Sequence, residues 1–463
     1  MDFDEYSFAD LLSNIVDNRG KTCPVEDEGF PLIATNCIKD DSLYPVFEKV
    51  RFVSDDTYKN WFRGHPNAGD IIFVCKGSPG RVAWVKEPVS FCIAQDMVAI
   101  RADQRVVDPM FLFSLLRSEQ VINKINNMHV GTLIPHFKKG DFKNLYLSIP
   151  RNMKLQRAIG LFYFSLSEKI EKNKEINQTL EQMAQALFKS WFVDFEPVKA
   201  KMAALEAGGS QEDATLAAMT AISGKDADAL AFFEREHPEQ YAELKATAEL
   251  FPSAMQDSEL GKIPEGWSIK PLDGIATYQN GLALQKFRPE NENDFLPVVK
   301  IAQLKKGFSD GEEKASPNIK PECIIDNGDV VFSWSGSLMV DIWCGGQAAL
   351  NQHLFKVSST KYPKWLYYKY TAHHLIEFQR IAEAKAVTMG HIKREHLSQA
   401  KCLIPSSETI CAFTPFFEPV LNRVISNRLE SRKLENLRDT LLPKLLSGEI
   451  TLPEAEQIIS EEA

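Results

Sequence analysis

The chain has 463 residues, 44% hydrophobic and 25% charged, which is enough for two or three domains with buried cores and excludes a mainly disordered protein. Its net charge of −10 resides in residues 202–260, with 3 basic and 12 acidic side chains, and in residues 451–463, with four glutamates and no base, so the remaining chain is mildly basic and compatible with DNA. Because the start MDFDEYSFAD is acidic and no apolar run approaches roughly eighteen residues, we expect a cytoplasmic protein without a membrane span.

Residues 1–151 are predicted to form a first α/β domain. The run GDIIF at 69–73, followed by Gly77 and Ser78, is typical of a strand, a turn and another strand. Further along, LIPHFK at 133–138 precedes a strand at 147–150 that ends in proline.

A long helix is predicted next, from residue 152 to about 192, within a spacer segment 152–200. Apolar residues recur at three-, four- and seven-residue steps, with charged residues between them, as in a coiled coil. Periodicity alone leaves open a second interpretation, an ordinary core helix of a larger domain. The stripe consists of Ile159, Leu166, Ile170, Asn173, Leu180, Met183 and Leu187.

Residues 201–260 are rich in alanine and glutamate and are predicted to form an acidic helical connector. Gly208, Gly209 and Gly224 divide it into shorter helices.

Residues 261–406 repeat the order of the first domain at a period near 255 residues. The run GDVVF at 328–332 with Gly336 and Ser337 matches 69–78, TMGHIK at 388–393 matches 133–138, and CLIP at 402–405 matches 147–150. A second spacer helix, 407–450, follows with its own apolar stripe. Asn427 falls on that stripe, as Asn173 does on the first, where a polar residue can fix register. The fold predicted is therefore α+β, with two similar domains joined by two long antiparallel coiled-coil helices.

Catalytic and metal-binding motifs are absent from the sequence. The eight cysteines form no CxxC pair, and neither they nor the nine histidines have zinc-ligand spacing, so we predict reduced thiols and no metal. There is no GxxxxGK[ST] phosphate loop, no GxGxxG turn and no Asn/Asp-Pro-Pro-aromatic motif of DNA amino-methyltransferases. We assign no catalytic residue and predict that the chain is not itself an enzyme.

Several longer strings resemble one family. The chain is similar to the specificity subunit of type I restriction-modification systems in GKIPEGW at 261–267, WSGS at 334–337, NQHLFKV at 351–357 and LRDTLLPKLLSGEI at 437–450. The resemblance extends to LEQMAQALFKSWFVDFEPV at 180–198 and FPSAMQDSELG at 251–261. The first 150 residues share only the order of elements and the Gly-Asp repeat.

This resemblance implies a sequence-specific DNA-binding protein. Each domain would be a target-recognition domain that reads one half of a bipartite double-stranded DNA site, and the helices would hold the domains apart and dock two modification (methyltransferase) subunits. Restriction (ATP-dependent translocase and nuclease) subunits would complete the complex. S-adenosylmethionine, ATP and Mg²⁺ would be bound by partners, and none by this chain. The alternative is a coiled-coil scaffold that assembles proteins without reading DNA.

Candidate DNA contacts are basic residues on loops and small residues in the repeated turn, because phosphate contacts position a protein and base-edge contacts specify sequence. For each basic residue, an ordinary solvated charge cluster is an equally good interpretation. Four further polar residues could read DNA bases or satisfy buried backbone groups. They are Gln347, Asn351, Gln352 and His353. The candidates are Lys76, Arg81, Lys138, Lys139, Lys143, Lys300, Lys305, Lys306, Ser335, Ser337, Lys393 and Arg394.

Four aromatic residues near the end of the first long helix are the candidate anchor for a modification subunit, since aromatic side chains are enriched at interface hot spots. The alternative is that they pack inside the chain's own core. They are Phe188, Trp191, Phe192 and Phe195.

Overall fold

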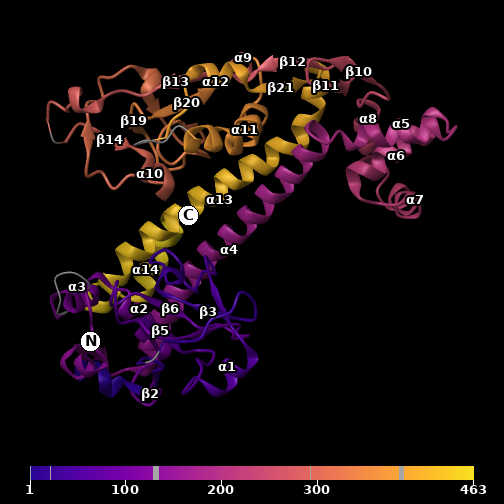
Figure 1. Cartoon of the computed structure of the whole chain (residues 1–463). Helices are drawn as coiled ribbons and strands as arrows, with labels where there is room; N and C mark the ends of the chain where they lie inside the picture. The colour runs from indigo at the N-terminus through magenta and orange to yellow at the C-terminus, as the bar shows by residue number, and fades with distance from the viewer. Residues whose placement is uncertain (1, 21, 129–134, 292, 385–389, 463) are drawn as a thin grey trace. The chain divides into compact units, whose positions relative to one another are not determined.

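The computed structural model describes residues 2–20, 22–128, 135–291, 293–384 and 390–462 (Figure 1). The chain forms two compact units. Unit 1 comprises Met1–Lys174 with Glu430–Ala463, and unit 2 comprises Glu175–Leu429. Two long helices, α4 (Met153–Phe192) and α13 (Ser407–Ser447), each contribute to both units.

Unit 1 holds a four-stranded antiparallel sheet, a three-stranded sheet and a strand pair. The four-stranded sheet has the order β2 (Leu12–Val16), β8 (Met97–Ala102), β5 (Ile71–Val74) and β6 (Val82–Trp84). The second has the order β4 (Arg51–Val53), β3 (Phe30–Ile33) and β7 (Cys92–Ile93), and β1 (Phe3–Ser7) pairs with β9 (Tyr146–Pro150). The helices are α1 (Asp55–Asn60), α2 (Pro109–Leu116), α3 (Glu119–Met128) and α14 (Leu452–Glu462), with 3-10 turns η1 (Phe8–Leu11), η2 (Thr35–Cys37) and η3 (Lys139–Asn144).

Unit 2 repeats this plan. One sheet has the order β13 (Thr277–Asn280), β20 (Leu354–Ser358), β17 (Val330–Ser333) and β18 (Met339–Ile342). The other has the order β15 (Lys314–Ala315), β14 (Leu296–Val299), β19 (Ala348–Leu350) and β16 (Ile324–Ile325), and β12 (Ser268–Pro271) pairs with β21 (Lys401–Ile404). The helices are α9 (Leu272–Ile275), α10 (Ile301–Lys306), α11 (Lys364–Ala384) and α12 (Arg394–Gln399), with η4 (Leu284–Lys286) and η5 (Pro321–Cys323).

The predicted duplication is confirmed in the register of these sheets. Ile71 of β5 pairs with Ile100 of β8, and Val330 of β17 pairs with Val357 of β20. In both units the second sheet contains one parallel pair, β3 with β7 and β14 with β19. The two halves therefore share their strand order and most of their pairing.

Both long helices pack antiparallel within each unit. In unit 1, Phe162 and Leu166 of α4 share a core with Leu437 and Leu441 of α13. In unit 2, Phe192 of α4 packs against α13, with its ring centroid 6.0 Å from that of Phe413. The long helix pair was predicted, and it is confirmed.

The polar residues on the apolar stripes are buried and bonded. Asn173 is 1% exposed, and its Nδ2 donates to Glu430 Oε2 at 2.8 Å. Asn427 is also 1% exposed and donates to Asn177 Oδ1 at 2.8 Å. Met183, placed on the stripe by its spacing, is instead 60% exposed, so that part of the predicted stripe is wrong.

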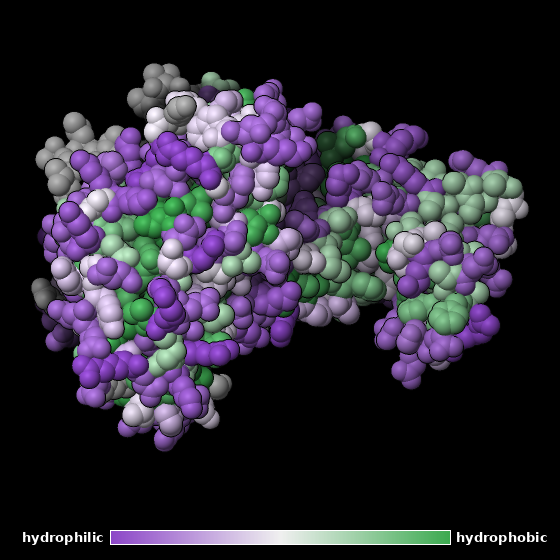
Figure 2. Space-filling view, turned by 90° about the horizontal axis from the view of Figure 1, so that it is seen from below, coloured by the Kyte–Doolittle hydropathy of each residue, from purple (hydrophilic) through white to green (hydrophobic). Residues whose placement is uncertain are grey.

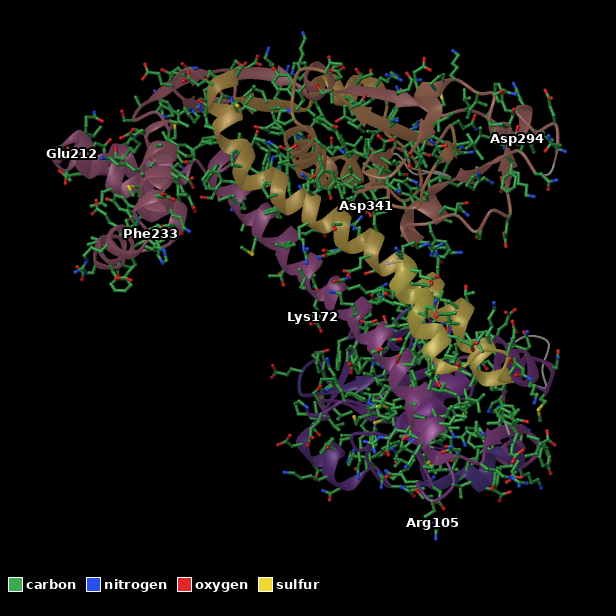
Figure 3. All side chains as sticks on the ribbon, turned by 180° about the vertical axis from the view of Figure 1, so that it is seen from behind. Arg105, Lys172, Glu212, Phe233, Asp294 and Asp341 are labelled. Atoms are coloured by element: carbon green, nitrogen blue, oxygen red, sulfur yellow. The ribbon has the colours of Figure 1, made fainter. Side chains whose placement is uncertain are left out.

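A cluster of four helices follows α4, and it consists of α5 (Glu196–Glu206), α6 (Gln211–Ser223), α7 (Ala227–Glu236) and α8 (Pro238–Glu249). The hairpin β10 (Met255–Ser258) and β11 (Gly261–Pro264) closes it. Figure 2 shows apolar side chains on the surface of this cluster, where Phe232 is 59% exposed. Figure 3 labels Glu212, which is exposed, and Phe233, which is half-buried against the core of the cluster.

Lys201 joins α5 to the end of α8 inside this cluster. Its Nζ is buried and donates to the carbonyl oxygens of Ala248 at 3.0 Å and Phe251 at 2.6 Å, at the C-terminal end of α8. The negative end of the helix dipole stabilises the ammonium there, although burial lowers the pKa of Lys201.

Candidate nucleic-acid interface

Three loop segments meet at one edge of the four-stranded sheet in each unit. In unit 1 the turn after β5 joins 135–138 through a bridge between Lys76 and His136, and the Cys75 N–H donates to the Asp96 carbonyl at 2.8 Å. In unit 2 Ser335 forms the same bridge with His391, and the Trp334 N–H donates to the His353 carbonyl at 3.4 Å. We call residues 76–80, 94–96 and 135–139 the first loop edge, and residues 335–338, 351–353 and 390–393 the second loop edge.

The predicted match between 133–138 and 388–393 is seen only in part, since residues 133, 134, 388 and 389 lie outside the described residues. In the described part, the Gly77 N–H donates to the Pro135 carbonyl at 3.0 Å, and the Gly336 N–H donates to the Gly390 carbonyl at 2.8 Å.

Basic side chains gather at the first loop edge. Lys138 and Lys139 are exposed, and Lys76 Nζ lies 4.0 Å from Asp96 Oδ1. Burial lowers the pKa of His136, and the charges of Arg19, Lys138 and Lys76 lower it further. Arg19 itself is held by Asp17 at 2.8 Å. This surface can contact phosphates.

Arg81 and Lys143 are placed elsewhere in unit 1. Arg81 forms an ion pair with Asp40 at 2.9 Å and lines a hollow with Arg117, Tyr163 and Arg438. Lys143 is exposed on η3. Of the five basic residues predicted in this half, the structure thus brings Lys76, Lys138 and Lys139 to the first loop edge.

The second loop edge has more uncharged polar side chains than the first. Ser335 is 3% exposed, and its Oγ lies 3.0 Å from Nδ1 of His353, so the side chain orients that histidine and cannot itself reach DNA. The Trp334 ring flanks His353 at 5.8 Å between centroids. Beside them is a hollow lined by Gln285, Lys300, Ile301, Ala302, Asn351, Gln352 and His353.

The other predicted residues of unit 2 differ in what they contact. Lys305 and Ser337 line one hollow with Gly336 and Gly390, so the structure brings these two together. Each of the other predicted cations has a partner within the chain. Lys300 pairs with Glu313, Lys306 with Asp310 at 3.6 Å, and Lys393 with Glu395 at 3.5 Å, while Arg394 donates to the Tyr278 carbonyl at 3.1 Å and lies over the Phe355 ring.

The four aromatic residues proposed as a partner anchor are not on the surface. Phe188 and Trp191 are 0% exposed, Phe192 is 2% exposed and Phe195 is 9% exposed. Trp191 packs against Phe251 and Phe413, with ring centroids 5.3 and 4.7 Å apart. The interface prediction for these residues is wrong, because the rings fill the core of unit 2.

One residue of the first loop edge was missed by sequence reasoning. Strand pairing places Gln95 where unit 2 has Gln352. Cys92 of β7 and Ala349 of β19 hold equivalent positions in the parallel ladders of the two units, and Met97 and Leu354 are the first residues of the strands that follow. The signal was present in the strings FCIAQDMVAI at 91–100 and AALNQHLFKV at 348–357, which align without a gap.

Comparison with known proteins decides the family. Residues 23–182 and 264–431 match the family described as "Type I restriction modification DNA specificity domain", once in each half of the chain. The chain belongs to this family. The specificity-domain matches include both loop edges, and the α5–α8 cluster lies between them.

Relatives within the specificity family cover most of the chain. The type I restriction enzyme HindI specificity subunit of Haemophilus influenzae is 30% identical over 399 residues, 82% of this chain and 86% of that protein. The MjaIX specificity subunit of Methanocaldococcus jannaschii is 24% identical over 83% of this chain and 78% of its own. Among solved structures, the S subunit from M. genitalium aligns over 96% of both chains with 12% identity and a TM-score of 0.48.

Neither a metal cluster nor a membrane helix is found in the described part of the chain. No group of three or more histidine, cysteine, aspartate or glutamate side chains there could hold a metal ion, and no helix there is long and apolar enough to cross a bilayer. All eight cysteines are free thiols, and only Cys411 among them is exposed.

Proposed function

We propose that this chain is the DNA-reading specificity subunit of a type I restriction-modification complex, and that each loop edge reads one half of a bipartite target. The observation that carries the proposal is the presence of two equivalent loop edges, one in each matched specificity domain. Exposed lysines at the first loop edge are suited to phosphate contacts, and the amide and imidazole side chains of Asn351, Gln352 and His353 at the second are suited to base contacts.

In this proposal the chain supplies recognition and its partners supply chemistry. Two modification subunits bind this chain, restriction subunits complete the assembly, and S-adenosylmethionine, ATP and Mg²⁺ are bound by those partners. Because the aromatic cluster is buried, we assign the modification-subunit contact to exposed apolar side chains of α4. Leu161 is 48% exposed and Met183 is 60% exposed.

The decisive experiment maps methylated positions in DNA from cells that express the whole operon. We expect one bipartite sequence. Replacing residues 1–150 with the corresponding segment of a relative should change one half of that sequence and leave the other intact. A simultaneous change in both halves would contradict the division between units, and the absence of any methylated sequence with intact partners would favour a scaffold.

A further inference from the structure

We propose that Gln95 and Gln352 are equivalent specificity-determining residues, each of which reads the adenine of one A·T pair in its own half-site. This inference rests on the proposed function and goes further, because it names the reading residue of each unit and the base that it reads.

The equivalence is structural as well as sequential. Each glutamine lies in the short connection from one sheet to an inner strand of the other, between β7 and β8 in unit 1 and between β19 and β20 in unit 2. The residue that follows each glutamine accepts a hydrogen bond from the turn after β5 or β17, through the carbonyl oxygens of Asp96 and His353. The backbone of each glutamine is therefore next to the residue that joins its segment to the turn in the loop edge.

The two glutamines are accessible, whereas their neighbours are engaged. Gln352 is exposed and lines the hollow beside Lys300, and Gln95 is half-buried. Asn351 is 4% exposed, and its Oδ1 accepts the His353 N–H at 3.2 Å. Asp96 faces Lys76. Gln352 Nε2 lies 3.4 Å from His353 Nε2, a long and exposed contact that DNA can replace.

The backbone at Gln95 adds a second observation. Its φ of +59° lies in the left-handed region, which non-glycine residues enter rarely and mainly at turns or functional sites. A glycine would relieve that strain, yet the chain has a glutamine there. This is expected if the amide side chain is required at Gln95, and the observation applies to unit 1 alone, because Gln352 does not have a positive φ.

Amide chemistry selects the base. A glutamine side chain presents a carbonyl acceptor and an N–H donor side by side, which match the N6–H donor and N7 acceptor of adenine in the major groove. Lysines around it, such as Lys76 and Lys138, carry only donors and suit phosphate oxygens. The loop edges thus combine positioning contacts with one amide reader each.

The test uses the complete complex with Gln95→Ala and Gln352→Ala. Methylation mapping should show discrimination at a single A·T position reduced at least roughly 10-fold, in one half-site for Gln95→Ala and in the other for Gln352→Ala. Binding of each purified complex to duplexes that differ only at that pair should show the same loss and does not depend on methylation. As a control, Lys76→Ala should weaken methylation of all targets without changing their sequence.

Other outcomes separate the two levels of the proposal. If the wild-type complex shows a target sequence and both variants keep it unchanged, the glutamines are not readers and only this inference is overturned. Loss of discrimination at a G·C pair, or in both half-sites from one substitution, also overturns this inference. A wild-type complex without any sequence preference would instead overturn the proposed function. The variant Gln95→Asn keeps an amide and tolerates the left-handed backbone, so it should fold. Because its side chain is one methylene shorter, it should lose discrimination at the A·T pair.

Discussion

The aspartate of each repeated Gly-Asp pair stabilises the turn in which it lies. Asp70 is 1% exposed, accepts the Asn67 N–H at 2.8 Å and forms an ion pair with Arg101 at 2.7 Å. Asp329 accepts the Asp326 N–H at 2.8 Å and pairs with Lys356 at 2.8 Å. The two turns are thus built in the same way, with the same local bond and a cation from the neighbouring strand. Such side-chain bonds to a nearby backbone N–H are what make aspartate a turn residue.

His374 makes unit 2 sensitive to acid. It is 9% exposed, its Nε2 donates to the Lys401 carbonyl at 3.1 Å, and burial together with the neighbouring His373 lowers its pKa from 6.5 to about 4. The unfolded chain therefore binds a proton first as the pH falls, so folding stability drops between pH 6.5 and about 4 and stays constant below that range. The loss attributable to this residue is on the order of 3 kcal/mol.

Amide hydrogen exchange of β21, measured from pH 7 to pH 4 after correction for intrinsic rates, checks this effect. The variant His374→Gln keeps a donor but cannot titrate, so its exchange should lose most of the pH dependence. Equal slopes in both proteins would show that other groups cause the acid sensitivity.

At the scale of elements, the antiparallel pair α4 and α13 carries a polar contact in unit 2 whose value can be measured. Because Asn427 donates to Asn177, Asn427→Leu alone should cost about 2 kcal/mol by leaving a buried amide oxygen without its donor. The double variant with Asn177→Leu should recover most of that loss, since both polar groups are then absent. Denaturant unfolding of the four proteins forms a double-mutant cycle, and additive costs would mean that the two amides do not interact.

A second polar contact joins three elements of unit 2. Arg428 of α13 pairs with Asp341 of β18 at 2.7 Å and with Glu181 of α4 at 2.9 Å, and Asp341 is seen beside α13 in Figure 3. It fixes the helix pair to the sheet in one orientation, because an arginine that bridges two carboxylates has few alternative geometries.

The sequence predicted these elements well where the signal is local, and less well where it depends on packing. Repeated strings were sufficient to place β5 and β17, because their turns are specified by adjacent residues. Periodicity could not tell which apolar side chains of α4 face the chain's own core. It left Trp191 open between a partner interface and the core, and it placed Met183 on the apolar stripe, whereas Trp191 is buried and Met183 is 60% exposed. Gln95 was missed because residues 91–100 and 348–357 align without a gap but share only the glutamine, so strand pairing was needed to recognise the match.

At the scale of the whole molecule, α4 and α13 run unbroken from one unit into the other, with 40 and 41 residues. At roughly 1.5 Å per residue, each is about 60 Å long, comparable with about 18 base pairs. Because Asn173 bonds to Glu430 across the pair, an insertion must lengthen both helices to keep their register.

Inserting four residues after Lys174 and four before Glu430 should therefore lengthen the pair by about 6 Å and rotate its ends by about 40°. We expect the unspecified gap between half-sites to grow by one or two base pairs, with both half-sites unchanged, in methylation mapping. A folded, methylating variant with the original gap would show that the helices are not the spacer.

Unit 1 closes only when the last part of the chain has been made. Its core combines Phe162 and Leu166 of α4 with Leu437 and Leu445, which follow about 275 residues later. At roughly 5 to 20 residues per second, the ribosome needs on the order of 10 to 50 s to synthesise that interval. During this time the apolar face of the first half of α4 is exposed on the nascent chain, so a pause in translation before residue 437 prolongs the period in which chaperones or other chains can bind it.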